Sequence, residues 1–342
     1  MLQQTPIKNP VLDVNTFRRS LRKWYRKHKR DLPWRRTEDP YRIWISEIML
    51  QQTRVAAVIP YYERFLALFP NASALALAPE QELLAAWAGL GYYSRARNLQ
   101  KAARAIVELP RFPKDYAALR QLPGVGDYTA AAVASIAFGA PHAVLDGNVL
   151  RVLSRIVAEP GDTKSQIVRA RLRALAETLL DRKRPGEFNQ ALMELGATVC
   201  LPKQPLCGNC PVRQHCQARQ QGVENQLPLN GQRPRSNRGE QHLLVIEKAG
   251  KLLLWQRPPD SRRLAGFWEL PEREQIPGAI VSGEVVEFRH IIVNTTYLVR
   301  VCRASAGSRP SGFHWLAKGN LGNVPLSTIA KKALILLARI TK

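Results

Sequence analysis

The spacing of apolar residues along the chain changes character near residue 222. Before that point, apolar positions recur at the three- and four-residue intervals of a helix, and Pro or Gly separates the segments. The clearest examples are the stretches 61–70, 80–91, 94–110 and 166–181. This pattern predicts an all-α domain over residues 1–221.

The remainder of the chain has the pattern of a linker and a smaller mixed domain. Residues 222–241 are polar, basic and rich in Gly and Pro, which is typical of a linker. The stretches that follow predict short strands and then a helix from Ser327; the strands are expected at 242–247, 252–257, 284–293 and 295–303. The sequence therefore predicts a multi-domain protein in which the all-α domain precedes an α+β domain at 242–342.

The chain carries a large excess of positive charge. Its 342 residues include 51 Lys and Arg against 27 Asp and Glu, which gives a net charge of +24. Such an excess suits a polyanionic partner, although a merely soluble surface would also account for it. A helix predicted over 17–30 places a cluster of Arg and Lys opposite a face formed by Phe17, Leu21, Trp24, Tyr25 and His28. That cluster fits contact with DNA and a solvated face equally well.

The ends and apolar runs of the chain indicate where it works. No run of about 18 apolar residues is present, so neither a membrane span nor a membrane partner is expected. The N-terminus lacks the charged-then-apolar pattern of a secretory signal. The expected location is therefore the cytoplasm, with the nucleoid of a bacterial-type cell as the site of action.

Four of the five cysteines lie close together, at Cys200, Cys207, Cys210 and Cys216. In a cytosolic chain such a cluster more often holds a metal than forms disulfides. Only the middle pair has the C-x2-C spacing usual for zinc, whereas four thiolates on one short loop suit a cubane iron–sulfur cluster. The pattern favours an iron–sulfur cluster over zinc. Cys302 lies alone in a predicted strand and is expected to be an ordinary buried thiol.

Two carboxylates stand in unusual surroundings. Glu47 lies among Ile, Trp, Met and Leu residues, and burial there would raise its pKa so that it could act as an acid near neutral pH. The same pattern equally fits a glutamate on the wet stripe of an amphipathic helix. Asp146 directly precedes an apolar helical run, which is typical of an N-cap and would keep its pKa low. One raised and one lowered carboxyl is the pairing that cleavage of a glycosidic bond requires.

A glycine turn at 122–132, LPGVGDYTAAA, precedes a run of small helix-forming residues. No strand is predicted before it and no third glycine follows, so the dinucleotide-binding pattern does not apply. A bend through Gly124 and Gly126 between two helices would instead expose backbone N–H groups at a helix start, which suits a DNA phosphate. The turn is therefore interpreted as a DNA-contacting hairpin.

These stretches together resemble the MutY-type adenine DNA glycosylases of the helix-hairpin-helix, endonuclease III-like superfamily. The matching motifs run from residue 31 to 216 in family order: DLPWR, WISEIMLQQT, GLGYYSRARNL, LPGVGDYTA, VLDGNVLRVLSR, FNQALMELGATVC and the cysteine loop. The resemblance implies a helix-hairpin-helix at about 118–137 and a Nudix-like C-terminal domain that recognises the lesion. It further implies a monomer that removes adenine mispaired with 8-oxoguanine or guanine in double-stranded DNA.

The resemblance also implies roles for individual residues. Glu47 would protonate adenine at N7, and Asp146 would stabilise the sugar cation. Tyr128 stands where superfamily members that also cut the strand carry a lysine, which implies base removal without strand cleavage. The remaining implied positions are Asn148 and Tyr128 in support of Asp146; Arg35 and Gln190 in the adenine pocket; Gln52 and Tyr92, with Leu90 close by, entering the duplex; Thr53, Gly124 and Gly126 contacting DNA; and the four clustered cysteines as ligands of a [4Fe-4S] cluster.

The expected Nudix-like domain departs from the hydrolase motif. Gly266 and Glu272 have the first spacing of that motif, but Ile280 and Val281 stand where Arg-Glu is required for metal binding. A binding role is therefore expected for this domain, and nucleotide hydrolysis is not.

A second departure concerns the opposing base. The family commonly reads 8-oxoguanine with a Phe-Ser-His loop, and the corresponding stretch here is Phe288, Arg289 and His290. Arg289 puts a long cation in place of a small hydroxyl, which could reach a phosphate or a base edge or could block the usual contact. Altered opposing-base preference is therefore one hypothesis for this chain.

Two alternative functions are open at this point. The first is another glycosylase of the superfamily, such as a pyrimidine or thymine-mismatch glycosylase, although Glu47 and Gln190 favour a purine pocket. The second is a DNA-binding homologue without catalysis. The presence of both Glu47 and Asp146 argues against that reading, because a binder gains nothing from two carboxylates near phosphates.

Overall fold

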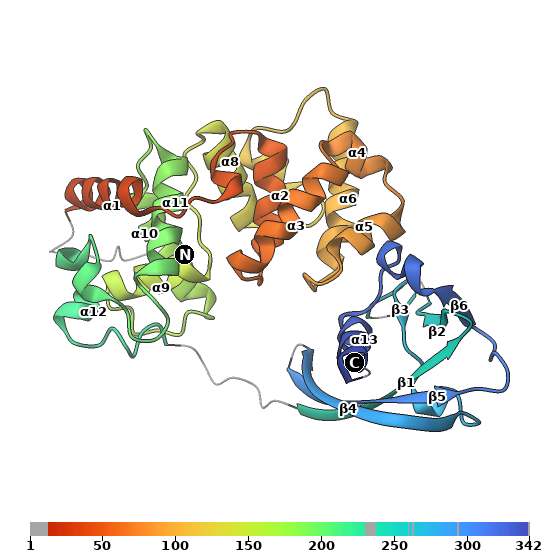
Figure 1. Ribbon diagram of the computed structural model, residues 1–342. Helices are drawn as coiled ribbons and strands as arrows, with labels where there is room; N and C mark the ends of the chain where they lie inside the picture. Colours follow the sequence, from red (N-terminus) through yellow and green to blue (C-terminus); the bar gives the residue numbers. More distant parts are fainter. Residues whose placement is uncertain (1–12, 230–236, 259, 262, 293, 341–342) are drawn as a thin grey trace. The chain divides into compact units, whose positions relative to one another are not determined.

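The computed structural model describes residues 13–229, 237–258, 260–261, 263–292 and 294–340 (Figure 1). Packing divides these residues into two compact units. The first contains 13–66, 71–73 and 101–229, and the second contains 67–70, 74–100 and the described residues from 237 onward. No helix in the described part is both long enough and apolar enough to cross a membrane.

Residues 14–220 are helical, as the apolar spacing predicts. The helices are α1 (Val14–His28), α2 (Pro40–Leu50), α3 (Val55–Leu68), α4 (Ala72–Leu77), α5 (Glu80–Trp87), α6 (Ser94–Val107), α7 (Tyr116–Arg120), α8 (Asp127–Phe138), α9 (Gly147–Ile156), α10 (Gln166–Leu179), α11 (Pro185–Thr198) and α12 (Gln217–Gln220), with short 3-10 turns at Pro33–Arg35, Cys207–Asn209 and Arg213–His215. A core of residues from α1, α8, α9, α10 and α11 holds the first unit together.

Local sequence signals explain where the helices near the site begin. Asp39 caps α2 by accepting the backbone N–H groups of Tyr41 and Arg42, and Pro40 occupies the first helical position. Gly126 caps α8, and Gly139 ends that helix in the left-handed conformation that glycine adopts most readily. The helix-hairpin-helix predicted at about 118–137 therefore corresponds to α7, the turn at 121–126 and α8.

The second unit contains a six-stranded sheet. Its strands are β1 (Asn237–Lys248), β2 (Lys251–Gln256), β3 (Trp268–Glu269), β4 (Ile280–Ile292), β5 (Thr295–Ser305) and β6 (Phe313–Ala317). The order is β3-β2-β1-β5-β4, with β6 also paired to β2; β1 and β5 are parallel and the other pairs are antiparallel. This α+β arrangement agrees with the predicted fold class.

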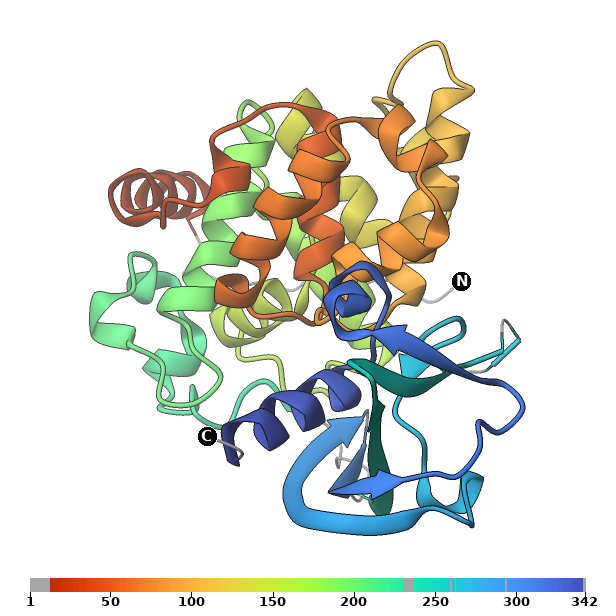
Figure 2. The same cartoon turned by 45° about the vertical axis from the view of Figure 1, so that its right-hand side comes forward.

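Alternating residues of the strands form two apolar faces. The helix α13 (Thr328–Ile340) covers one face, where Ala330, Ala333 and Leu337 pack with Leu243 and Val301 (Figures 1 and 2). The other face is formed by Leu244, Ile246, Leu253, Ile276, Ala304 and Phe313. The two faces explain why both strands of the central parallel pair are rich in apolar residues.

The packing does not follow the predicted domain boundaries. Residues 74–100 belong to the same unit as the sheet, because the Tyr93 ring lies 4.1 Å from the Phe267 ring and Arg97 donates to the Ala265 carbonyl. The predicted linker 222–241 also differs, because β1 already begins at Asn237. Residues 230–236 of that linker lie outside the described residues.

Candidate active site

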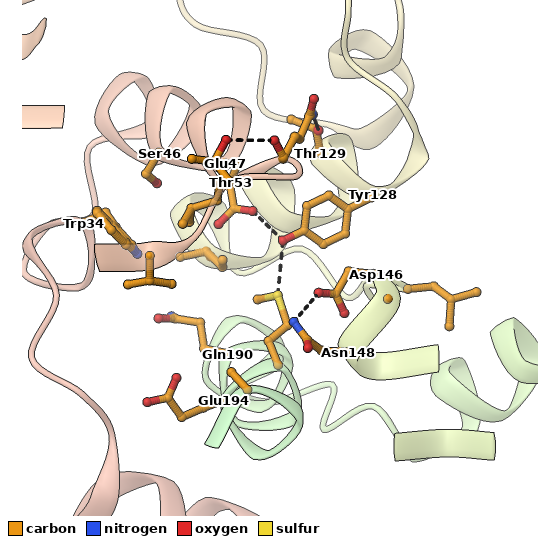
Figure 3. Close-up of a pocket in the computed structure, with 18 of the residues that line it drawn as sticks. Trp34, Ser46, Glu47, Thr53, Tyr128, Thr129, Asp146, Asn148, Gln190 and Glu194 are labelled. Carbon is orange, nitrogen blue, oxygen red and sulfur yellow. Dashed lines mark hydrogen bonds between the residues drawn. The ribbon is translucent and has the colours of Figure 1, made fainter. Parts of the chain in front are cut away.

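The first unit contains a cavity of about 850 Å³. Side chains from α2, α8, α9 and α11 line it, and Figure 3 shows the acidic and amide groups among them pointing inward. The volume lies in the range of small-molecule sites in proteins. The predicted residues Arg35, Glu47, Gln52, Thr53, Gly124, Gly126, Tyr128, Asp146, Asn148 and Gln190 all line this one cavity.

Glu47 lies on the buried side of α2. It is 5% exposed, and the Tyr128 hydroxyl donates a hydrogen bond of 2.6 Å to its Oε2 atom (Figure 3). Burial raises the pKa of Glu47 from 4.5 to about 7, partly opposed by the Tyr128 hydrogen bond and reinforced by the nearby charge of Asp146. The structure therefore decides between the two readings of Glu47: it is a buried acid that holds a proton near neutral pH.

Asp146 is both the N-cap of α9 and part of the cavity wall. Its carboxylate accepts the Val149 backbone N–H at 2.7 Å and the Asn148 side-chain amide at 3.0 Å. The expectation of a low pKa is wrong, because desolvation in the cavity raises the pKa of Asp146 and outweighs these bonds. The predicted support of Asp146 by Asn148 is present as a direct hydrogen bond.

Tyr128, the second residue of α8, differs from its expected role. The family resemblance implied that Tyr128 supports Asp146, whereas its hydroxyl donates to Glu47 and lies 3.2 Å from the Met193 sulfur. Burial raises the pKa of Tyr128 well above 10, so the hydroxyl keeps its proton. Tyr128 therefore acts on the proposed acid and not on the opposing carboxylate.

The wall of the cavity opposite Glu47 contains residues that the sequence analysis missed. Glu194 is fully buried and accepts hydrogen bonds from Arg30 and from Arg35, the latter at 2.8 Å. Gln190 accepts the Tyr25 hydroxyl at 3.1 Å. The signal for Glu194 was its position one turn after Gln190 on α11, since residues four apart share a helix face.

A chain of hydrogen bonds also leads from Asp146 toward the cysteine loop. Asn148 donates to Asp146 and accepts from Arg151, whose guanidinium also donates to the backbone carbonyls of Gly196 and Cys200. Arg151 was not identified from the sequence. Its contacts fasten the turn that carries Asp146 to the segment where the cysteines begin.

The rim of the cavity contains the residues expected to contact DNA. Gln52 is exposed and has a positive φ of 56°, and Gly124 has a φ of 76°. A positive φ at a non-glycine residue is uncommon and often marks a functional turn. The Gly126 backbone and the first turn of α8 follow directly, and Gln51 beside Gln52 donates to the Thr129 hydroxyl of that turn at 3.2 Å. The hairpin and the Gln52 turn therefore both line the cavity.

The predicted residues at 90–92 lie in the second unit and differ from one another in exposure. Tyr92 is 50% exposed with a positive φ of 47°, which agrees with an exposed turn. Its neighbour Tyr93 is buried against Phe267. Leu90 is only 6% exposed, so its predicted contact with DNA is corrected: the side chain packs inside the unit.

The stretch 288–290 is also in the second unit, and it is not a loop. Phe288, Arg289 and His290 lie within β4 and pair with Val299, Leu298 and Tyr297 of β5. Phe288 is buried beneath Lys332, whose Nζ lies 4.5 Å from its ring, whereas Arg289 is exposed. Burial and the Lys332 charge lower the pKa of the half-buried His290. Because successive side chains of a strand point to opposite faces, Arg289 is the one fully exposed residue of these three.

The four clustered cysteines come together around a second, small cavity. Cys200, Cys207, Cys210 and Cys216 line it with apolar side chains and Arg155. Arg155 is 1% exposed and fastens the loop by donating to the carbonyls of Leu201, Pro202 and Leu227 and to the Cys200 sulfur. Among the described residues, no three His, Cys, Asp or Glu side chains are arranged to hold a single metal ion.

The chain is similar to known DNA repair proteins over most of its length. Residues 45–177 match the HhH-GPD superfamily base excision DNA repair protein family. The adenine DNA glycosylase of Homo sapiens is 39% identical over 94% of this chain and 74% of its own length, and that of Mus musculus is 38% identical over 94% and 78%.

Two solved structures resemble the helical part. A thermostable thymine-DNA glycosylase is 30% identical with a TM-score of 0.54, covering 61% of this chain and 97% of that chain. A non-covalent endonuclease III–DNA complex has 22% identity and a TM-score of 0.52, covering 62% of this chain and 99% of that chain. The second likeness shows the fold alone.

Proposed function

Because this chain belongs to the family of adenine DNA glycosylases, we propose that it removes adenine from mispairs with guanine or 8-oxoguanine in double-stranded DNA. The observation that carries the proposal is the cavity of about 850 Å³, large enough to admit a base, which the buried Glu47 and the half-buried Asp146 both line. The reaction is hydrolysis of the N-glycosidic bond of the mispaired adenine.

The two carboxyls divide the chemistry between them. Glu47, with a pKa of about 7, donates its proton to the leaving adenine, which then departs as a neutral base. Asp146 stabilises the cation that develops on the sugar, and the hydrogen bonds from Asn148 and Val149 favour the ionised form of Asp146. Water then bonds to the sugar C1′ and releases a proton, which leaves the abasic sugar. The target nucleotide must leave the base stack to reach this cavity, at a cost of roughly a few kcal/mol.

Base removal proceeds without strand cleavage. Strand cutting in this superfamily uses an amine that attacks the sugar, and position 128 carries a tyrosine whose hydroxyl is engaged with Glu47. The nearest side-chain cations on the cavity wall are guanidinium groups, which stay protonated and are poor nucleophiles. The product is therefore an abasic site in an intact strand.

The opposing base is read by the second unit with altered preference. Arg289 projects outward from β4 at the stretch that corresponds to the usual Phe-Ser-His contact. A guanidinium donates to acceptor edges, which both guanine and 8-oxoguanine present. Single-turnover rates on A:G and A:8-oxoG duplexes test this. Similar rates agree with altered recognition, and a strong preference for 8-oxoguanine refutes it.

The four cysteines hold a [4Fe-4S] cluster. The four cysteines of this short loop line one small cavity, and four thiolates brought together on one short loop suit a cubane iron–sulfur cluster. When bound, the cluster would fix the loop that carries Lys203 and Arg213. Iron and acid-labile sulfide in the purified protein support this assignment, and zinc in their place refutes it.

The protein acts as a monomer on DNA. Its net charge of +24 favours a phosphate backbone, and the helix start at Gly126 offers backbone N–H groups to one phosphate. Affinity for a non-cleavable mispair duplex should therefore fall steeply with salt, and the complex should contain one protein chain by light scattering.

The decisive experiment is base release from a panel of duplexes that vary the target base and its opposite. We expect release of adenine and none of thymine or cytosine, and thymine release would favour the alternative glycosylase activity. Glu47→Gln and Asp146→Asn should each abolish release while DNA binding persists. The matched control Glu63→Gln changes a glutamate of α3 outside the cavity and should release adenine at the wild-type rate.

A further inference from the structure

Tyr25 lies behind the cavity wall and contacts two residues of that wall. It is 3% exposed on α1, and its hydroxyl donates to the Gln190 Oε1 atom at 3.1 Å. The Arg35 guanidinium lies 5.5 Å from the centre of its ring. Gln190 and Arg35 line the cavity, whereas Tyr25 does not. Tyr25 can therefore influence a bound base only through these two neighbours.

The hydrogen bond to Gln190 determines which end of its amide faces the cavity. A glutamine amide has one oxygen acceptor and an NH2 group with two donors. Burial raises the pKa of Tyr25 to about 12, so its hydroxyl stays protonated and donates. With Oε1 committed to Tyr25, the Nε2 group is the part of Gln190 that is left for a bound base.

Glu194 likewise holds the side chains of the neighbouring Arg30 and Arg35 in place by accepting hydrogen bonds from them. Its carboxylate is fully buried and accepts the Arg30 backbone N–H at 2.9 Å, the Arg30 side chain at 2.9 and 2.7 Å and the Arg35 side chain at 2.8 Å. These bonds lower the pKa of Glu194 to about 2 despite its burial. Its acceptor capacity is used within the wall, and Arg35 has only donors to offer.

We propose that Tyr25 is a positioning residue that locks the Gln190 amide with its N–H groups toward the cavity, so that this wall donates to a ring nitrogen of the bound adenine. The inference rests on the proposed function and adds a basis for how the base is held. Each unprotonated ring nitrogen of adenine accepts such a bond, whereas a carbon–hydrogen group in its place cannot. Loss of the Tyr25 hydroxyl frees the amide to turn over and present its oxygen.

Single-turnover adenine release tests the coupling in a double-mutant cycle. Tyr25→Phe should slow release about five- to tenfold, the effect of one buried hydrogen bond. In a Gln190→Ala background, Tyr25→Phe should slow adenine release by less than about twofold, because the residue through which Tyr25 acts is missing. The control Tyr62→Phe removes the hydroxyl of another tyrosine that is 3% exposed, and it should leave the rate unchanged. Equal losses in both backgrounds would show a merely structural role and overturn the inference.

A binding measurement separates this inference from the proposed function. Calorimetric titration with free adenine and with its 1-, 3- and 7-deaza analogues, each of which lacks one ring-nitrogen acceptor, gives the ratio of their affinities without any catalysis. Wild type should prefer adenine to the analogue that lacks the contacted nitrogen, and Tyr25→Phe should narrow that affinity ratio by about fivefold or more. If wild type fails to excise adenine yet the ratio narrows, the proposed function fails and the role of Tyr25 stands. An unchanged ratio in Tyr25→Phe overturns the role of Tyr25 whatever the catalytic result.

Discussion

Replacement of Tyr128 by Phe should move the pH dependence of base release to higher pH. The Tyr128 hydroxyl donates to Glu47 at 2.6 Å, and this bond is stronger when the carboxylate is ionised. It therefore opposes the burial that raises the pKa of Glu47 to about 7. Without the hydroxyl, burial acts with less opposition and the pKa of Glu47 rises further.

The size of this effect can be worked from the hydrogen bond. A bond to a charged group contributes about 1.5–3 kcal/mol, and one pKa unit corresponds to about 1.4 kcal/mol. The protonated acid keeps part of the bond, so we expect a rise of about one unit, from about 7 to about 8. Because release requires protonated Glu47, the rate falls as the pH rises through this pKa. At pH 8 the protonated fraction would increase from about one tenth to about one half, roughly fivefold.

The assay is single-turnover adenine release from an A:G duplex, with abasic sites revealed by hot alkali. The rate at pH 8 is divided by the rate at pH 6 for each protein, so that a uniform loss of activity cancels. Tyr62→Phe serves as the control and should keep the wild-type ratio. An alkaline limb that stays in place, or moves to lower pH in Tyr128→Phe, would refute the assignment of Glu47 as the acid that Tyr128 tunes.

Three further predictions concern stability and chemistry. The folded-state pKa of Glu47, about 7, lies above its unfolded value of 4.5, so the protonated form stabilises the fold and that stability is lost as the pH rises between these values. Glu47→Gln should therefore raise the free energy of unfolding by up to about 3 kcal/mol at pH 8 and change it little at pH 4.5, as measured by urea unfolding. Equal effects at both pH values would contradict the raised pKa of Glu47 in the folded protein. Gly196→Ala would place a Cβ atom 2.6 Å from the Asn148 Cβ, so it should lower the free energy of unfolding by about 1–3 kcal/mol and slow base release. The control Gly278→Ala meets open space and should change neither the stability nor the rate. Tyr128→Lys places an amine in the cavity and should allow borohydride to trap a covalent complex with DNA, which wild type should not form; trapping by wild type would contradict base removal without strand cleavage.

Several features of the site could be predicted from the chain alone because they depend on local order. The glycine turn and the small residues after it predict the hairpin that α7 and α8 form. The position of Asp146 before an apolar helical run predicts its N-cap, which α9 confirms. The spacing of the four cysteines brings them to one loop, and the structure places all four around one cavity.

Other features depended on packing that no local pattern records. The sequence around Glu47 fits a solvent-exposed helix face and a buried site equally well. The side chain is buried because other elements pack around α2. The pKa of Asp146 was predicted to be low but is raised. The N-cap that lowers it can be recognised in the sequence, whereas desolvation by side chains distant in the chain cannot. Leu90 was expected to lie close to the duplex, yet its side chain is buried.

The sequence by itself determined which groups are available: a cluster of thiols, one carboxyl within an apolar helical stretch and one before a helix start, a glycine hairpin and an excess of cations. The tertiary structure decided what these groups do to one another. Tyr128 reaches Glu47 across 81 positions of the chain, and Tyr25 reaches Gln190 across 165. The proton on Glu47 and the orientation of the Gln190 amide follow from desolvation and hydrogen-bond direction, and both exist only once residues far apart in the chain are packed together.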